Sequence, residues 1–439
     1  MAAAAKPQPH LPEDMVEEIL WRQPVKSLLR FSCVSKLWHA LITSPTFTKI
    51  LLSQNRMNMV VLTNDCIPQI FAYEALLYPP QNNNNNDDDD DDVVCDEGSE
   101  FGAIDHGFLQ SFDYDEALLY PQNNNHVVYD EYSEFGVDVG FPLRGANNED
   151  VYTKLSSCNG LVCVEFFNWK RKMTEVLLWN PSTRSYREIP RSRPTPLSSE
   201  YFSFGFGYDY STDDYKILRP YRFYQNTFQK RLKFNLTADD FQIEMFSLKT
   251  FSWRTIQDKN NICTQKLSSS PYNNINLNGT IYWIVKPHNK PSIIYFDLTE
   301  ELFHELPWPC AENFDCHYSE LGIFGEHLCL SVTDEINLCV ELWVMKESSW
   351  TRLLTIPYWR SLKYCPRPIF LSNRNNIGEL LMLDSNPDIY LGMNLTMYNL
   401  KENTHRTIFR PRQPEEPPFE PPVIAVATYV ESLYSLDAT

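Results

Sequence analysis

The sequence predicts a small all-α module followed by an all-β propeller, and three observations lead to this prediction. The first is a set of apolar residues at helical spacing near the start of the chain. The second is a pattern of hydrophobic strands that recurs about every fifty residues from Ser156 onward. The third is the composition: 30 prolines, 14 glycines and 14% aromatic residues suit many short strands joined by turns.

Apolar stripes and prolines divide the first segment into three short helices. Val16, Ile19 and Leu20 are spaced as one face of a helix that Pro24 ends. A second helix is expected from Val25, a third around the sequence "LWHALI", and "TFTKILLSQNR" offers a short fourth helix. Three short helices are too few to bury all these apolar side chains, so the module is expected to bind a partner protein. The alternative is a helical cap that packs only on the following domain.

The β-domain is predicted from aromatic landmarks in successive copies of the strand pattern. These landmarks are 67, 50, 47 and 55 residues apart: Trp179, Phe246, Phe296, Trp343 and Tyr398. Such spacing is typical of a propeller with one four-stranded sheet per blade. The dipeptides Asn159-Gly160 and Asn278-Gly279 predict tight hairpins within two of these blades.

Five copies are visible, and the two ends of the domain are expected to form a further blade. "MNMVVLT" (residues 57–63) and "PPVIAVATYVESLYSL" (residues 421–436) each read as strand-forming segments. Their pairing would close the ring and leave no open sheet edge. The prediction is therefore about six blades, with a β-sandwich or an open β-domain as the structural alternative.

An acidic, internally duplicated segment separates the two domains. Residues 64–150 contain 21 acidic residues and one basic residue, a net −20 within a whole-chain charge of −19. The rest of the chain is nearly neutral, which argues against nucleic acid as a ligand. The run of six aspartates from Asp87 lacks the spacing of a calcium loop, so a disordered insertion is expected. The predicted boundaries are a helical module at 8–55, a first propeller strand at 56–63, the insertion at 64–150 and the propeller domain at 151–439.

No pattern for catalysis, a cofactor or a metal was found. The 11 cysteines form no C-x-x-C pair and several lie in apolar runs, so buried reduced thiols are expected. A phosphate-binding glycine loop, an H-x-x-x-H pair and a nucleophile elbow are absent from the sequence. Neither a membrane span nor a secretory signal is expected, and these features together predict a non-enzymatic protein of the cytoplasm or nucleus.

The first helices resemble the F-box. The resemblance is carried by "LPED" at residues 11–14, "IL" at 19–20, "PVKSLLRF" at 24–31, "CVSK" at 33–36 and Trp38. It implies binding to the Skp-family adaptor of an SCF (Skp–cullin–F-box) ubiquitin ligase. Trp21 and Gln23 depart from the pattern, which places a small residue and a leucine there. The adaptor-binding residues that the resemblance implies are Leu11, Pro12, Val16, Ile19, Leu20, Pro24, Val25, Leu28, Leu29, Val34 and Trp38.

The strands resemble the kelch-like F-box-associated domain of plant F-box proteins. "CNGLVCV", "WNPSTR", "GFGYD…DYKILR", "YFDL", "LWVM…SWTRLLTI" and "YVESL" appear in the family's order, and the S-locus F-box and S-locus F-box-like proteins look most similar. The resemblance implies a client-recognition subunit of an SCF ubiquitin ligase, with S-ribonuclease recognition in pollen self-incompatibility as one candidate role. The alternative is a propeller enzyme or carbohydrate-binding protein with a helical cap.

The client is expected to bind loops at one end of the propeller. The run from 219 to 235 mixes basic and aromatic residues, a combination that is typical of interface hot spots, although part of it could be a solvated outer strand. The predicted client-binding residues are Arg219, Arg222, Tyr224 and Arg231.

Overall fold

The structure, a computed structural model, describes eighteen stretches of the chain. They are residues 12–54, 57–62, 68–72, 153–168, 173–191, 200–201, 204–222, 241–262, 274–285, 291–309, 319–324, 326–334, 339–357, 367–372, 379–385, 393–399, 404–409 and 425–436.

The N-terminal module has four short helices where the sequence predicts three with an optional fourth. They are α1 (Glu13–Trp21), α2 (Val25–Phe31), α3 (Lys36–Ile42) and α4 (Pro45–Ser53). Pro45 does not simply end the third helix, because it occupies the first turn of α4, where a missing N–H costs nothing. Ser44 caps that helix by accepting a hydrogen bond from the Phe47 backbone N–H at 3.2 Å. The prediction of three helices was therefore one short.

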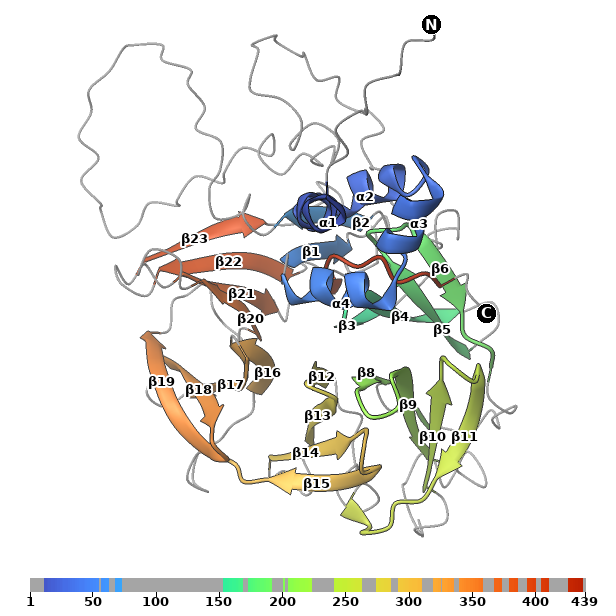
Figure 1. Ribbon diagram of the computed structural model, residues 1–439. Helices are drawn as coiled ribbons and strands as arrows, with labels where there is room; N and C mark the ends of the chain where they lie inside the picture. The colour runs from blue at the N-terminus through green and yellow to red at the C-terminus, as the bar shows by residue number, and fades with distance from the viewer. Residues whose placement is uncertain are drawn as a thin grey trace, which may run out of the picture.

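Five sheets form five propeller blades arranged around a common axis (Figure 1). Four have four antiparallel strands, and the sheet that contains β7 to β11 has five. The first two sheets comprise β3 (Thr153–Cys158), β4 (Leu161–Asn168), β5 (Met173–Asn180), β6 (Ser185–Glu188), and β7 (Glu200–Tyr201), β8 (Gly205–Asp209), β9 (Asp214–Arg222), β10 (Phe241–Ser247), β11 (Ser252–Ile256). The third and fourth comprise β12 (Asn274–Leu277), β13 (Thr280–Val285), β14 (Ser292–Asp297), β15 (Leu302–Leu306), and β16 (Ser319–Phe324), β17 (His327–Asp334), β18 (Cys339–Lys346), β19 (Ser349–Pro357). The fifth comprises β20 (Arg367–Ser372), β21 (Glu379–Ser385), β22 (Met393–Asn399) and β23 (Thr404–Phe409).

The two ends of the propeller meet in a further, three-stranded sheet. Its order is β2 (Pro68–Ala72), β1 (Met57–Leu62) and β24 (Ala425–Val430). The predicted pairing of the early and late segments is thus observed, with Met57 opposite Val430. The strand β2 lies inside residues 64–150, the segment that is predicted to be the acidic insertion. The remainder of the predicted insertion, residues 73–150, lies outside the described residues.

The aromatic landmarks all fall on the third strand of a blade, counted in hydrogen-bonded order from its first strand. Trp179, Phe246, Phe296, Trp343 and Tyr398 lie on β5, β10, β14, β18 and β22 respectively. Both Asn-Gly dipeptides form the predicted two-residue hairpins, with Cys158 paired to Leu161 and Leu277 paired to Thr280. All four turn residues have positive φ, as the tight right-twisted hairpin requires.

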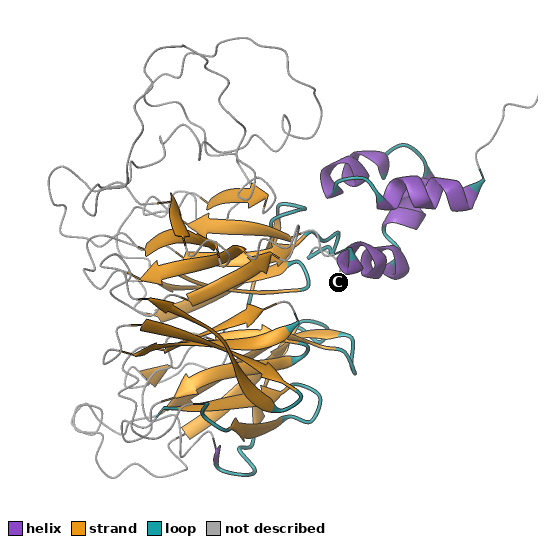
Figure 2. Cartoon of the chain, turned by 90° about the vertical axis from the view of Figure 1, so that its left-hand side faces the viewer, coloured by secondary structure: helices purple, strands orange, loops and turns teal. Residues whose placement is uncertain are grey.

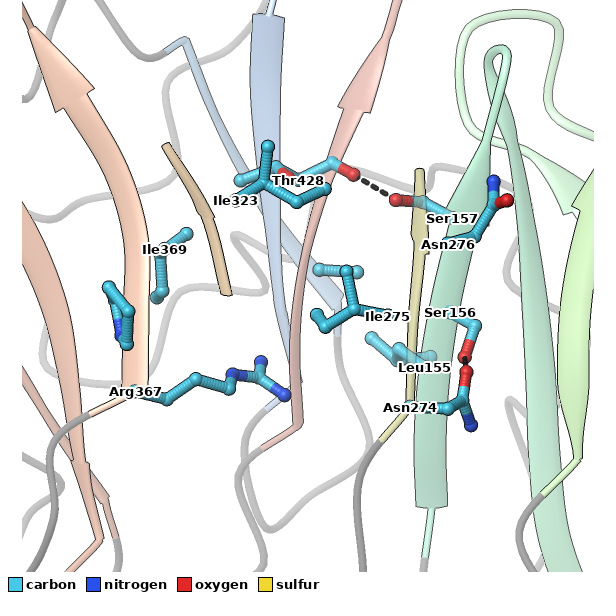
Figure 3. A pocket seen from close by; sticks show the side chains of 12 residues that line it. Leu155, Ser156, Ser157, Asn274, Ile275, Asn276, Ile323, Arg367, Ile369 and Thr428 are labelled. Atoms are coloured by element: carbon cyan, nitrogen blue, oxygen red, sulfur yellow. Dashed lines mark hydrogen bonds between the residues drawn. The ribbon is translucent and has the colours of Figure 1, made fainter. Parts of the chain in front are cut away.

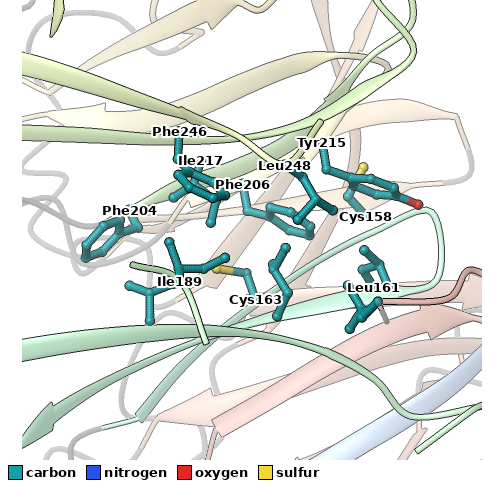
Figure 4. Packing of buried hydrophobic residues seen from close by; sticks show 13 residues of the cluster. Cys158, Leu161, Cys163, Ile189, Phe204, Phe206, Tyr215, Ile217, Phe246 and Leu248 are labelled. Atoms are coloured by element: carbon teal, nitrogen blue, oxygen red, sulfur yellow. The ribbon is translucent and has the colours of Figure 1, made fainter. Parts of the chain in front are cut away.

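The hydrophobic core lies between neighbouring blades. One cluster joins the β3–β6 sheet to the β7–β11 sheet, with Phe206 and Phe246 fully buried between them (Figure 4). Burial of a side chain of this size contributes about 1.5–3 kcal/mol. Similar clusters join the β7–β11 sheet to the β12–β15 sheet, and the β16–β19 sheet to its neighbours on either side. The helical module stands at the face of the propeller where the described hairpin turns and the C-terminus lie (Figure 2).

Candidate protein-interaction surfaces

The helical module has a complete hydrophobic core of its own. The six side chains at its centre are at most 1% exposed: Leu20, Val25, Leu28, Ile42, Phe47 and Leu51. They come from all four helices, so the fourth helix supplies the apolar surface that three helices would lack. The core side chains of the module are therefore covered by its own four helices.

The same module exposes an unusual amount of apolar surface. Five of the eight large hydrophobic side chains that are exposed in the described residues belong to it, although it is a small part of the chain. They are Met15 at 53%, Ile19 at 46%, Leu29 at 36%, Val34 at 64% and Leu37 at 59% exposed. Apolar side chains concentrated on so small a module are typical of a surface that binds another protein.

The predicted adaptor-binding residues differ in how much of their side chains the structure exposes. Ile19, Leu29 and Val34 are exposed apolar residues, whereas Val16 and Trp38 are partly buried against the core. Leu20, Val25 and Leu28 lie inside the core and offer a partner no surface, so their assignment as direct contacts was wrong. Of the three remaining positions, Pro12 is exposed and precedes α1, Pro24 precedes α2 and is partly buried, and Leu11 lies outside the described residues.

Two exposed residues were missed by the sequence analysis. Met15 and Leu37 were not among the predicted contacts, although both belong to the helical stretches. Met15 lies one turn before Ile19, and this spacing of four would have identified it as part of the same exposed stripe.

The two residues that depart from the F-box pattern have structural roles. The ring of Trp21 packs against the core, with its centre 6.5 Å from that of Phe47. The side-chain amide of Gln23 donates to the carbonyl oxygen of Ile19 at 3.2 Å and so caps the end of α1.

Of the predicted client-binding residues, Arg219 proves to be structural. It lies on β9 with only 11% of its side chain exposed, and its guanidinium is 3.8 Å from the Glu244 carboxylate. The guanidinium also lies 5.5 Å from the ring centre of Tyr221 and 6.0 Å from that of Trp253. Such contacts hold a cation within a blade and leave little of it for a partner. In this structure Arg219 therefore offers a client little surface.

A partly buried carboxyl group, that of Glu165, lies near the same arginine. Burial raises the pKa of Glu165, while the charge of Lys154, the Phe204 backbone N–H and the charge of Arg219 act in the opposite direction.

The structure says less about the other three predicted client-binding residues. The backbone of Arg222 belongs to β9 and pairs with Glu200 and Phe241. The strand therefore extends into residues 219–222, which were predicted to belong to a loop. Tyr224 and Arg231 lie outside the described residues.

A small cavity lies among the innermost strands of the propeller (Figure 3). Its volume is about 70 Å³, and β3, β12, β16, β20 and β24 contribute its lining. Ser156 and Ser157 on its wall donate to Asn274 Oδ1 and to the Thr428 carbonyl oxygen respectively. Sites for small molecules are usually about 300–1,000 Å³, so this cavity does not support the alternative of a carbohydrate-binding or catalytic centre.

The described residues hold neither a metal-binding cluster nor a membrane-spanning helix. Among the stretches that the structure describes, three or more His, Cys, Asp or Glu side chains never gather as they would around a metal ion. Within the same stretches, each helix is too short or too polar to cross a membrane.

Comparison with known proteins gives matches to both parts of the chain. The F-box domain family matches residues 9–50, and the F-box associated beta propeller domain family matches residues 137–436. The F-box/kelch-repeat protein At3g23880 of Arabidopsis thaliana is 27% identical over 378 residues, which cover 83% of this chain and 84% of the relative. F-box protein CPR1 of the same plant is 24% identical over 384 residues, 80% of this chain and 74% of the relative.

Solved structures resemble the chain only distantly. The Hadza microbial sialidase Hz136 aligns with a TM-score of 0.37 and 12% identity, over 59% of this chain and 58% of that one. AofleA from Arthrobotrys oligospora aligns with a TM-score of 0.36 and 8% identity, over 60% of this chain and 71% of that one. Scores at this level carry no argument about function. The family matches establish which family the chain belongs to, because the propeller family alone covers more than half of the sequence. The chain belongs to the F-box associated beta propeller family and carries an F-box domain ahead of its propeller.

Proposed function

We propose that this protein is the substrate-recognition subunit of an SCF ubiquitin ligase. Its F-box helices bind the Skp-family adaptor and, through it, the cullin, while the propeller holds a client protein for ubiquitination and degradation. The observation that carries the proposal is the exposed apolar set on the F-box helices, which remains exposed although the module has its own complete core. A partner that covers these side chains would bury the surface that the module itself leaves in water.

In this role the chain acts by proximity and performs no bond-making step. Holding a client beside the conjugating enzyme raises the effective concentration of the client's lysines at the reactive thioester. The relatives named above are F-box proteins, and this supports an adaptor in preference to an enzyme.

The client and the compartment remain proposals that the sequence supports. The resemblance to S-locus F-box proteins makes an S-ribonuclease in pollen self-incompatibility a candidate client, and the cytoplasm or nucleus is the compartment we propose. We also propose that the sheet of β2, β1 and β24 serves as the sixth blade, since it joins the first and last strands of the domain.

The test of adaptor binding compares two exposed apolar surfaces. Ile19→Asp combined with Val34→Asp places two charges on the F-box surface without entering its core. Tyr186→Asp is the matched control, because Tyr186 lies on the propeller and is 46% exposed, the same fraction as Ile19. Loss of interface hot spots typically costs at least about 2 kcal/mol, which corresponds to roughly 30-fold weaker binding.

The expected result is a loss of at least that size for the double variant in titrations with the purified adaptor. The control should bind as wild type, and the circular dichroism of both variants should be unchanged. Wild-type affinity of the double variant would contradict the proposal. A variant such as Leu28→Asp does not test the surface, because a charge inside the core unfolds the module.

A further inference from the structure

The F-box helices are joined to the propeller covalently by a short link. Helix α4 ends at Ser53, and the first propeller strand, β1, begins at Met57. Two domains that are joined by one link and a small interface usually move relative to each other. Whether the F-box has a fixed angle on the propeller therefore depends on further contacts.

The C-terminal segment, residues 431–436, returns to this junction. It follows β24, which runs antiparallel to β1 with Val430 opposite Met57. The segment therefore leaves the sheet at the end where α4 enters it. There Leu433 packs against the core of the F-box helices, although it is hundreds of residues away from them in the sequence.

The same segment is fastened to the propeller on its other side. The side-chain amide of Asn180, fully buried at the end of β5, donates to the carbonyl oxygens of Ser432 at 3.1 Å and Tyr434 at 2.8 Å. The ring of Tyr434 lies edge-on to that of Tyr215 at 4.9 Å, and Leu436 is buried in the core between two blades. The segment therefore contacts the F-box through Leu433 and the propeller core through Leu436.

A charged contact also links the two parts, but it contributes little to the angle. Lys49 on α4 lies 3.5 Å from Asp213 in the turn between β8 and β9, and the two side chains are 69% and 61% exposed. Exposed ion pairs are screened by water and stabilise weakly. The apolar contact of Leu433 restricts the angle more than this ion pair does, because Asn180 holds the backbone of the segment in place.

We propose that residues 431–436 fix the angle between the F-box and the propeller, with Leu433 as the positioning residue. The covalent link alone is a hinge, and a second attachment point beside it converts the hinge into a rigid joint. The functional consequence rests on the proposed function: a fixed angle sets where a client held by the propeller stands relative to the adaptor and the conjugating enzyme.

The test measures the angle in the full-length protein. Spin labels are attached to non-natural amino acids at two exposed positions, Ser53 on α4 and Thr250 in a propeller turn. The distance between the two labels reports the angle of the joint. Leu433→Ser removes the contact with the F-box, and Leu433→Ala weakens it less. Leu330→Ala is the matched control, because it truncates a leucine that is buried between two other blades of the propeller, away from the segment.

The expected result is one narrow distance distribution in the wild type and in Leu330→Ala. The distribution should be at least twice as wide in Leu433→Ser and of intermediate width in Leu433→Ala. Restoration of the narrow distribution by Leu433→Met would show that apolar contact at this position is what matters. A distribution of wild-type width in both Leu433→Ser and Leu433→Ala overturns the proposal, and so does equal broadening in Leu330→Ala.

This outcome is independent of the adaptor. The distances are measured without it, so a failure of the proposed function would appear in the adaptor titration and leave the distances unaffected. If the proposed function holds and only the fixed angle fails, the adaptor titration is unaffected. Leu433→Ser should bind the adaptor within about twofold of wild type, because the exposed F-box residues are unchanged.

Discussion

The buried side-chain amide of Asn180 donates a hydrogen bond to the main-chain carbonyl oxygen of Ser432, 252 residues later in the chain. Its Oδ1 atom accepts from the Ser182 backbone N–H at 2.9 Å and so also shapes the turn after β5. One side chain thereby links a hairpin of the first described blade to the C-terminal segment. This link is made by a residue of the "WNPSTR" motif, which the sequence marks only as a strand end and a turn.

Asn180→Ala should therefore destabilise the propeller by about 2 kcal/mol, because buried carbonyl oxygens lose their donor and water does not reach them. Unfolding in urea, followed by tryptophan fluorescence, measures the change. Thr250→Ala is the control: Thr250 lies in the corresponding turn of the next blade, is exposed, and should change the stability by less than about 0.5 kcal/mol. Equal effects of the two substitutions would mean that the Asn180 link is unimportant.

Gly160 and Gly279 form a matched pair, since each is the second residue of an Asn-Gly hairpin with φ near +80°. A Cβ atom at Gly160 would come within 2.0 Å of the Ser432 Cβ, whereas at Gly279 the nearest atom is the Tyr208 carbonyl oxygen at 3.2 Å. Gly279→Ala should cost about 1–2 kcal/mol from backbone strain alone. Gly160→Ala should cost clearly more, because the C-terminal segment must also move.

Thermal unfolding of the two glycine variants measures this difference directly. Adding Ser432→Gly to Gly160→Ala should recover part of the loss, since it removes the nearest obstructing atom. Recovery would stay incomplete because the Val430 carbonyl oxygen also lies 2.9 Å from the new Cβ atom. If Gly160→Ala is no worse than Gly279→Ala, the close approach of the segment is not maintained in solution.

Asp209 and Lys216 form a buried ion pair within the β7–β11 blade. Lys216 Nζ lies 2.6 Å from Asp209 Oδ2, and the two side chains are 6% and 1% exposed. Burial opposes ionisation of Asp209, but hydrogen bonds from Lys216, Thr212 and Ser211 outweigh it and hold the pKa of Asp209 below its usual value. Asp209→Asn should destabilise the protein by about 3–5 kcal/mol at pH 7, because it leaves a buried ammonium without its main partner.

The pH dependence follows from the direction of that pKa shift. A carboxyl group whose folded pKa is lowered adds stability above its unfolded pKa, about 4, and loses this contribution as the pH falls toward the folded pKa. The stability difference between wild type and Asp209→Asn should therefore be constant between pH 7 and pH 5 and should shrink below about pH 4. Urea titrations at pH 7, 5, 4 and 3.5 provide the measurement. A difference that grows as the pH falls would contradict this account of Asp209.

The sequence by itself determined the local structure of this protein. Prolines marked where helices begin and end, Asn-Gly pairs marked two hairpins, and the spacing of five aromatic residues located the third strand of each blade. These features are local because a missing N–H, a positive φ or an alternation of apolar residues acts within a few positions of the chain. The family motifs reached the function for the same reason, since the F-box pattern lies within about forty residues of sequence.

Only the tertiary structure decided which side of each element is covered, because burial depends on neighbours that come from distant parts of the chain. Ile19 and Leu20 are adjacent in one apolar stripe, yet Ile19 is 46% exposed and Leu20 is 1% exposed, since α4 completes the core on one side alone. Arg219 stands in a basic, aromatic run that is typical of interfaces, yet packing within the blade turns it inward. Leu433 ends the motif "YVESL", but no local pattern indicated what it contacts, because its partners are the F-box helices at the other end of the chain.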